Sequence, residues 1–343
     1  MHPDPTLIPS KLSESPPVWQ REWQASFRKP LELLEFLGLE INEAPEPLEL
    51  DPSFPFLVPR DYAARMHKSD WSDPLLRQVL PLYSENASPA GFVSDAVGDL
   101  AAQNKPGLLC KYHGRALLLL SGACAVHCRC CLRREFPFAG LPAARTEWEQ
   151  IYAGLVPDTD LKEIIFSGGD PLSLSDANLR WHWERALAIP QVRRIRIHTR
   201  LPVVIPSRIN PGFLELVEAM SARKQLYFVS HANHPNEIHA ELKARFRALS
   251  STGAMLLNQA VLLRGVNDNA GDLVSLSERL LDCGVLPYYL HQLDRVRGAQ
   301  HFEVPEEKGL ALMTELRRRL PGYGVPKYVR EVAGEKFKIA ISL

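Results

Sequence analysis

Four of the six cysteines in the chain lie within eight residues, in the segment SGACAVHCRCCLRREF (121–136). Cys124, Cys128 and Cys131 have the spacing C-x3-C-x2-C, and a loop of this length lets three thiolates converge on one cluster. In a cubane of four irons, three cysteine ligands leave one iron without a protein ligand, whereas a cluster that only transfers electrons normally has four. The spacing therefore predicts a [4Fe–4S] cluster that takes part in chemistry.

A zinc site and idle thiols are the alternative interpretations of this segment. Structural zinc sites favour a C-x2-C pair with a second pair far away, but the remaining cysteines, Cys110 and Cys283, are single. His127 lies inside the loop and is either a further ligand or a solvent-facing side chain. Cys130 creates a second register, C-x3-C-x-C, and is interpreted as a bystander of the first.

The composition is that of an ordinary globular protein. The 343 residues have a formal net charge of zero and are 45% hydrophobic, and no basic run indicates a nucleic-acid track. The most apolar stretch, ALLLLSGACAV (116–126), is too short to span a bilayer. The first residues, MHPDPTLIPSKL, lack the basic region and apolar core of a secretory signal. We therefore expect a cytoplasmic protein with reduced thiols and with neither a nucleic-acid nor a membrane partner.

Residues 1–105 are predicted to form a helical, proline-punctuated extension. Within it, residues 18–39 have helical apolar spacing broken at Pro30, and residues 73–83 carry a second helical pattern. From Arg115 onward, strand and helix signals alternate in six consecutive units. The expected strands are 115–122, 161–170, 192–200, 224–232, 254–263 and 285–293. The expected helices are 146–155, 175–189 with Ser175 as a cap, 210–221, 236–253, 269–284 and 305–320.

Such alternation predicts an α/β fold with a parallel sheet and helices outside it. The units could be doubly wound or could curve into a barrel. Since six units fall short of the eight of a closed barrel, we expect a partial, open barrel. In both architectures functional residues gather at the carboxyl ends of the strands. The residues at these ends are Cys124, Ser167, Gly168, Gly169, Asp170, His198, Arg200, His231, Asn258, Gln259 and the run from His291 to Asp294.

The cysteine spacing after the first strand of a βα series resembles the radical S-adenosylmethionine (SAM) superfamily. In that superfamily the open iron binds the amino and carboxylate groups of SAM, and the reduced cluster cleaves SAM to a 5'-deoxyadenosyl radical. The segment SGGDPL (167–172) resembles its glycine-rich segment. The resemblance implies a partial (β/α)6 radical SAM barrel over residues 106–320. The SAM contacts that it implies are Gly168, Gly169, Asp170, His198 and Gln259.

Further segments resemble one family of that superfamily, the lysine 2,3-aminomutases. They include CKYHGRALLL, CRCCLRR, IFSGGDPL, HANHPNE, LLNQAVLLRGVNDN and GYGVPKY, and the similarity runs from about Asp73 to the carboxyl end. The sequence is most similar to the short EpmB type, which supplies (R)-β-lysine for modification of translation elongation factor P. The resemblance implies an isomerase that converts (S)-α-lysine to (R)-β-lysine.

The cofactors implied by the resemblance are a [4Fe–4S] cluster, SAM and pyridoxal 5'-phosphate (PLP). The implied partners are the lysine substrate, a reducing partner of the flavodoxin or ferredoxin kind, and a functional link to elongation factor P and its β-lysine ligase. A homo-oligomer is left open.

The lysine that forms the PLP Schiff base falls by resemblance on Lys338, in a carboxy-terminal segment of residues 321–343. Lys336 is a close competitor, because the family commonly has glycine or serine before this lysine and Phe337 stands there in this chain. The PLP phosphate needs cations or backbone amides. The resemblance places Arg115, Lys111 and Tyr112 near it.

The substrate has a carboxylate and a distal ammonium group, and the resemblance gives each a partner. A fork-shaped guanidinium suits a carboxylate, and the family position is Arg133. The acidic pair for the ammonium matches Asp294 and Glu331, and two acids there would disfavour a dicarboxylate substrate.

Three other functions share part of this pattern. They are a catabolic or antibiotic-pathway lysine aminomutase that makes free β-lysine, a radical SAM enzyme without PLP, and a non-catalytic iron–sulfur redox protein. Product stereochemistry, the absorbance of a PLP–lysine adduct and SAM cleavage distinguish them.

Overall fold

The computed structural model of the protein describes residues 16–342. The amino-terminal residues in which we expected no secretory signal therefore lie outside the described residues. The same holds for the first fifteen residues of the predicted extension and for the last residue of the carboxy-terminal segment.

A ten-stranded sheet forms the centre of the molecule, and its strands lie side by side in the order of the sequence. Seven adjacent strands, β3 to β9, are parallel, and the first six of them belong to the predicted βα units. These six are β3 (Arg115–Ser121), β4 (Glu163–Gly168), β5 (Arg194–Thr199), β6 (Gln225–Ser230), β7 (Met255–Val261) and β8 (Leu286–His291). All six lie where the alternation predicts a strand, so the α/β class and the parallel sheet are confirmed.

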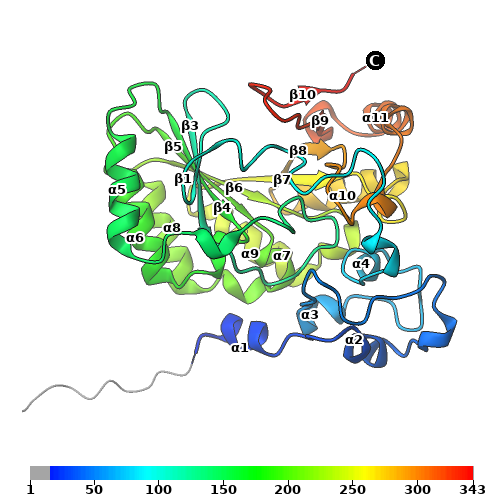
Figure 1. Ribbon diagram of the computed structural model, residues 1–343. Helices are drawn as coiled ribbons and strands as arrows, with labels where there is room; N and C mark the ends of the chain where they lie inside the picture. Colours follow the sequence, from blue (N-terminus) through cyan, green and yellow to red (C-terminus); the bar gives the residue numbers. More distant parts are fainter. Residues whose placement is uncertain (1–15, 343) are drawn as a thin grey trace, which may run out of the picture.

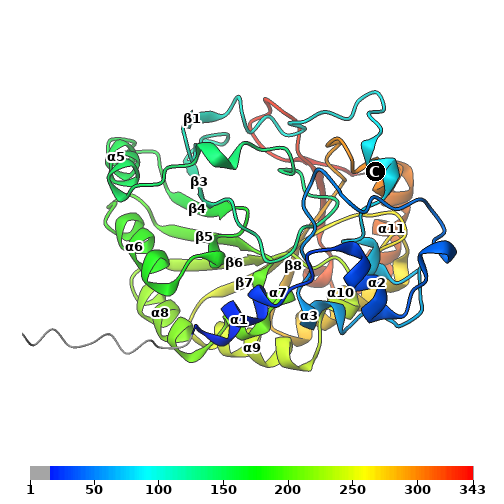
Figure 2. The same cartoon turned by 60° about the horizontal axis from the view of Figure 1, so that its bottom comes forward.

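Long helices follow the parallel strands at the predicted positions. They are α5 (Arg145–Leu155), α6 (Asp176–Leu187), α8 (Pro211–Ser221), α9 (Ala240–Ser251), α10 (Ala270–Asp282) and α11 (Glu306–Arg319). Figures 1 and 2 show α5, α6, α8 and α9 along the outer side of the strands. Ser175 caps α6 as predicted, since its Oγ accepts a hydrogen bond from the Asn178 backbone N–H at 3.3 Å. Each helix buries one apolar face against the sheet, which is the layer arrangement expected of βα units.

The edges of the sheet and one helix were not predicted. At one edge β1 (Gln103–Lys105) and β2 (Leu108–Leu109) are antiparallel; at the other, β9 (Lys327–Arg330) is parallel to β8 and β10 (Ile339–Ala340) is antiparallel to β9. The helix α7 (Leu201–Val204) follows β5. Elements of two to four residues are too short to show a period. The segment that contains Lys338 lies between β9 and β10.

The amino-terminal region has short helices and packs on the same core as the sheet. Its helices are α1 (Val18–Gln24), α2 (Pro30–Leu37), α3 (Arg60–Ala63) and α4 (Pro74–Arg77). The predicted break falls at Pro30, which occupies the first position of α2, where its missing N–H costs nothing. Trp19 and Leu33 belong to the same buried apolar cluster as Leu118 and Ile197 of the sheet.

Short 3-10 turns connect many of these elements. They are Ile41–Glu43, Tyr83–Asn86, Phe138–Gly140, Pro171–Ser173, Pro206–Arg208, Pro235–Glu237, Gln300–Phe302 and Gly322–Gly324. Across residues 16–342, none of the helices has both the length and the apolar character that crossing a membrane requires.

Candidate active site

One cavity of about 660 Å³ is lined by every residue that the sequence assigned to a cofactor or to the substrate. The residues come from the turn before β3 and its first residue, from the loop after β3, from β4, β5, β7 and β8 or the turns that follow them, and from the segment between β9 and β10. They are Cys124, Cys128, Cys131, Gly168, Gly169, Asp170, His198, Gln259, Lys111, Tyr112, Arg115, Arg133, Asp294, Glu331 and Lys338. The fold thus brings residues from both ends of the sheet to one cavity, which includes the carboxyl ends of the parallel strands and the amino end of β3.

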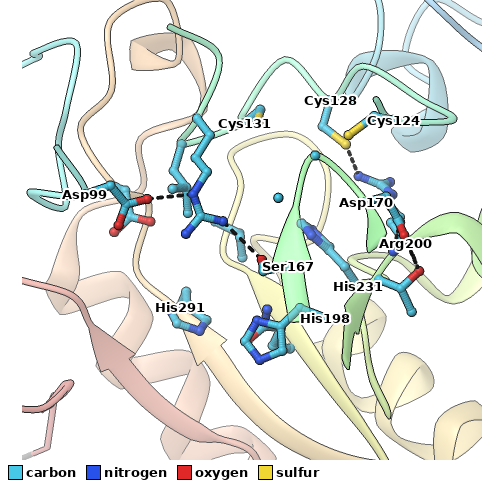
Figure 3. A pocket seen from close by; sticks show the side chains of 18 of the residues that line it. Asp99, Cys124, Cys128, Cys131, Ser167, Asp170, His198, Arg200, His231 and His291 are labelled. Atoms are coloured by element: carbon cyan, nitrogen blue, oxygen red, sulfur yellow. Dashed lines mark hydrogen bonds and ion pairs between the residues drawn. The ribbon is translucent and has the colours of Figure 1, made fainter. Parts of the chain in front are cut away.

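The three cysteines of the spaced motif lie on the loop above the strand ends (Figure 3). The backbone of this loop is fixed to the amino-terminal region, because the N–H of His127 donates to Leu57 O at 3.0 Å. Burial raises the pKa of Cys124, and it raises the pKa of Cys131 to about 11. A metal cluster binds the thiolate forms, so its binding would oppose this effect of burial and release protons.

Two further side chains of the cysteine loop, His127 and Cys130, have surroundings of their own. Among the described residues, no group of three or more histidine, cysteine, aspartate or glutamate side chains that could hold a metal ion is found. His127 Nδ1 instead contacts Pro55 O at 3.0 Å. Cys130 is buried in an apolar cluster with Leu263 and Val296.

The two glycines at the end of β4, Gly168 and Gly169, leave room for the start of the cysteine loop. A Cβ on Gly168 would lie 2.2 Å from Ser121 O, and one on Gly169 would lie 2.6 Å from Ala123 O. Gly168 also has a backbone φ of +134°, a conformation that residues other than glycine rarely adopt. The two glycines therefore let the start of the cysteine loop cross directly over the end of β4.

Replacing Gly168 with alanine should destabilise the protein by at least about 3 kcal/mol, since the new Cβ meets backbone and the φ is strained. Thermal unfolding measures the change. Gly140→Ala is the control, because nothing lies within 4 Å of a Cβ at that position. Equal melting temperatures for the two variants would contradict this account.

Asp170 connects the ends of β4 and β5 through hydrogen bonds. Its carboxylate is buried and accepts hydrogen bonds from Thr199 Oγ1 at 2.8 Å and from the backbone N–H groups of Arg200 at 2.7 Å and Leu201 at 2.9 Å. It also accepts one from the Leu172 N–H at 2.9 Å. These contacts support a positioning role for Asp170, which fixes the turn after β5 relative to the turn after β4.

Neutral histidines surround the deeper part of the cavity (Figure 3). Burial lowers the pKa of His198, and it lowers the pKa values of His231 and His291 to about 3. The buried Nε2 atoms of His198 and His291 have no hydrogen-bond partner among the described residues. Two neutral imidazoles with unpaired polar atoms fit a bound cofactor that would supply the missing hydrogen bonds.

A chain of alternating charges forms one wall of the cavity. Lys338 Nζ pairs with Glu331, whose other carboxylate oxygen accepts from Lys111 Nζ at 2.8 Å. Lys111 Nζ also lies 2.5 Å from Asp99 Oδ1, and Asp99 Oδ2 accepts from Arg133 Nε at 2.6 Å. Burial alone would raise the pKa of Glu331, but the two ammonium groups outweigh it and lower the pKa to about 2. The sequence did not identify Asp99, which is a lone acid in a turn with no motif around it.

The structure separates the two candidate lysines for PLP. Lys338 lines the cavity and pairs with Glu331, whereas Lys336 is exposed and is not among the lining residues. Phe337 contributes to the lining between them.

A basic, aromatic corner lies next to this wall. The Arg115 guanidinium lies 5.7 Å from the centre of the Tyr112 ring, and Arg196 pairs with Glu163. The hydroxyl of Tyr289, which also lines the cavity, lies 2.9 Å from that of its neighbour Tyr288. Cations and hydroxyls together suit a phosphate group. Arg196 and Tyr289 are additions to the residues that the sequence identified.

Asp294 is a half-buried acid that lines the same cavity. Burial, followed by repulsion from Glu331, raises the pKa of Asp294 to about 7. The ionised carboxylate of Asp294 would attract a cationic group of a bound ligand.

The affinity for a cationic substrate should therefore fall as the pH falls through 7. Asp294 attracts an ammonium group only when ionised, so KM for lysine should rise about tenfold between pH 8 and pH 6, while the substrate's own ammonium stays charged. Steady-state kinetics at saturating cofactor concentrations measures this. Asp294→Asn should raise KM at pH 8 and remove the dependence. A KM that is flat from pH 6 to 8 in the wild type would contradict the role.

Comparisons with known proteins place the chain in a family. No family model matches the sequence. L-lysine 2,3-aminomutase of Escherichia coli (strain K12) is 44% identical over 290 residues, which cover 84% of each chain. L-lysine 2,3-aminomutase of Buchnera aphidicola is 40% identical over 95% of each chain, and that of Acetoanaerobium sticklandii is 35% identical over 91% of this chain and 76% of its own. The chain therefore belongs to the L-lysine 2,3-aminomutase family, whose members are radical SAM isomerases.

Proposed function

We propose that the protein is a PLP-dependent lysine 2,3-aminomutase that converts (S)-α-lysine to (R)-β-lysine. The observation that carries the proposal is the single cavity in which Cys124, Cys128 and Cys131 face Lys338, Arg133 and Asp294. When bound, the cluster and SAM supply a carbon-centred radical, and PLP supplies a conjugated ring that delocalises unpaired spin. In the proposed architecture a partial (β/α)6 barrel of residues 106–320 is flanked by the extension 1–105 and the segment 321–343.

The cofactors are assigned to three parts of the cavity. Cys124, Cys128 and Cys131 would hold the cluster, and the ends of β4, β5 and β7 with Gly169, His198 and Gln259 would contact SAM. The basic, aromatic corner with Arg115, Tyr112 and Lys111 would bind the PLP phosphate, and Lys338 Nζ would hold PLP covalently. The unpaired Nε2 atoms of His198 and His291 support bound groups in this region.

The charged wall would orient the substrate. Arg133 is held by Asp99 at 2.6 Å and by Ser167 Oγ at 3.3 Å, so its guanidinium is fixed for the substrate carboxylate. Glu331 and Asp294 would attract the distal ammonium group of lysine, and Lys338 beside Glu331 would hold PLP. Lys111 keeps Glu331 ionised. A dicarboxylate would meet two acids at this position and be excluded.

We further propose that the β-lysine serves the modification of elongation factor P in the cytoplasm, with a flavodoxin or ferredoxin-like protein as electron donor. The support is the resemblance of the sequence motifs to the EpmB type.

The test is to incubate anaerobically reconstituted protein with reductant, SAM, PLP and (S)-α-lysine, and to separate the products by chiral chromatography. (R)-β-lysine is the expected product, and it should be attached to elongation factor P when the β-lysine ligase is added. The absence of β-lysine would overturn the proposed activity. The (S) enantiomer, or a product that the ligase does not use, would overturn the finer assignment alone.

A further inference from the structure

A buried arginine contacts one of the cluster cysteines. Arg200 follows β5, is 7% exposed, and its Nη1 donates to Cys128 Sγ at 2.8 Å (Figure 3). The proposed function gives this side chain no role. A permanently charged guanidinium is costly to bury, so its surroundings must compensate the charge.

The other side of the guanidinium is held by a rigid, buried set of acceptors. Arg200 Nη2 donates to Glu237 Oε2 and to Gln78 Oε1, each at 2.8 Å, and lies 3.3 Å from the Tyr62 hydroxyl. Glu237 and Gln78 are both 0% exposed. Glu237 also accepts from the Asn233 backbone N–H at 2.8 Å. With these contacts Arg200 has little freedom, and Nη1 is aimed at the sulfur.

Gln78 contacts both Arg200 and the backbone next to Cys128. Its side-chain oxygen accepts from Arg200, while its backbone oxygen accepts from the N–H of Arg129, the residue after Cys128, at 2.9 Å. Asn233 Nδ2 donates to the same side-chain oxygen at 2.9 Å. The amino-terminal region thus sets the distance between a buried cation and a cluster ligand, and a change in that region would alter both.

We propose that Arg200 tunes the reduction potential of the cluster by donating a charge-assisted hydrogen bond to the Cys128 thiolate. The inference rests on the [4Fe–4S] cluster of the proposed function. Reduction adds one electron, from dithionite or a one-electron protein donor, to a cluster whose thiolates already make it anionic, and no bond is formed or broken. A cation and a hydrogen bond at the ligand sulfur stabilise the reduced, more negative state and raise the potential. Glu237, on the far side of the guanidinium, opposes this effect.

Two charge-removing variants of the holoenzyme should therefore shift the potential in opposite directions. In Arg200→Gln the midpoint should become more negative, by about 59 mV, which is a tenfold lower ratio of reduced to oxidised cluster at a fixed potential. In Glu237→Gln it should become more positive. The measurement is a redox titration followed by electron paramagnetic resonance, without SAM, on protein of known iron and sulfide content. A general loss of stability would not produce shifts of opposite sign.

The controls separate charge from packing. Arg200→Lys keeps the charge and should retain most of the wild-type potential. Arg208→Gln removes a second buried arginine, which contacts Leu172 O at 2.8 Å and Asp176 at 2.7 Å. Because these partners are not cluster cysteines, this variant should leave the potential unchanged.

The outcomes distinguish this inference from the function on which it rests. A wild-type midpoint in cluster-loaded Arg200→Gln would overturn the inference, and weaker SAM binding at an unchanged potential would make Arg200 a SAM ligand. If Arg200→Gln does not take up a cluster, Glu237→Gln decides, and an unchanged or more negative midpoint there overturns the inference. A wild-type protein that takes up no cluster would overturn the proposed function itself.

Discussion

Replacing Cys124 with alanine is expected to abolish SAM cleavage and to reduce β-lysine formation by at least roughly 1000-fold. Three cysteine ligands already leave one of the four irons without a protein ligand. The loss of one cysteine therefore leaves two irons without one. The neighbouring Cys128 and Cys131 line the same cavity and cannot replace the missing bond. Iron and sulfide content, the paramagnetic signal of the reduced cluster and the yield of 5'-deoxyadenosine measure the effect.

Cys130→Ala is the matched control for this prediction. Cys130 packs among Leu263, Val266 and Leu293, so its truncation should cost about 1 kcal/mol or less and leave the cluster in place. Cys131→Ala should behave like Cys124→Ala. The opposite pattern, with the cluster lost in Cys130→Ala and kept in Cys131→Ala, would establish the C-x3-C-x-C register.

Replacing Lys338 with alanine is expected to lower aminomutase activity by about 100-fold or more and to remove the absorbance of a PLP–lysine adduct. Lys338 lies in the cavity beside Glu331, and its ammonium is the largest cause that lowers the pKa of that acid. The variant therefore also raises the pKa of Glu331, which keeps its contact with Lys111 Nζ at 2.8 Å. Cluster content should be unchanged, which separates this defect from that of the cysteine variants.

Lys336→Ala is the control, because Lys336 is exposed and two residues away. It should retain the absorbance and at least half of the activity. Loss of the adduct in Lys336→Ala, with its retention in Lys338→Ala, would reverse the assignment that the cavity supports.

The amino-terminal region contributes directly to the site. Asp99 supplies a carboxylate to Arg133 and Lys111, and Gln78 holds both Arg200 and the backbone of the cysteine loop. Both residues lie in the part of the chain that the sequence analysis described as an extension. The amino-terminal region therefore positions the cysteine loop and Arg133 as well as covering the core.

Long periodic segments made most of the fold predictable. The parallel strands and the helices that follow them bury apolar side chains, and that burial leaves a pattern in the sequence, which is a short apolar run in the fully buried β4 and a helical period in the amphipathic α10. The strands β9 and β10 leave no such pattern, because they have only four and two residues. For this reason the prediction missed the pair of strands that delivers Lys338.

The sequence by itself determined the order of the βα units and the spacing of the three cysteines that we propose as cluster ligands. A cluster ligand set contained in one short loop depends on local spacing, which a sequence displays directly. Only the tertiary structure decided which charges face one another, since Arg133 pairs with Asp99 across 34 positions, Arg200 with Gln78 across 122, and Lys111 with Glu331 across 220. Such pairs form because burial in a low-dielectric interior requires a partner of opposite charge or a hydrogen-bond acceptor. The fold decides which residue takes that place, and no local pattern records it.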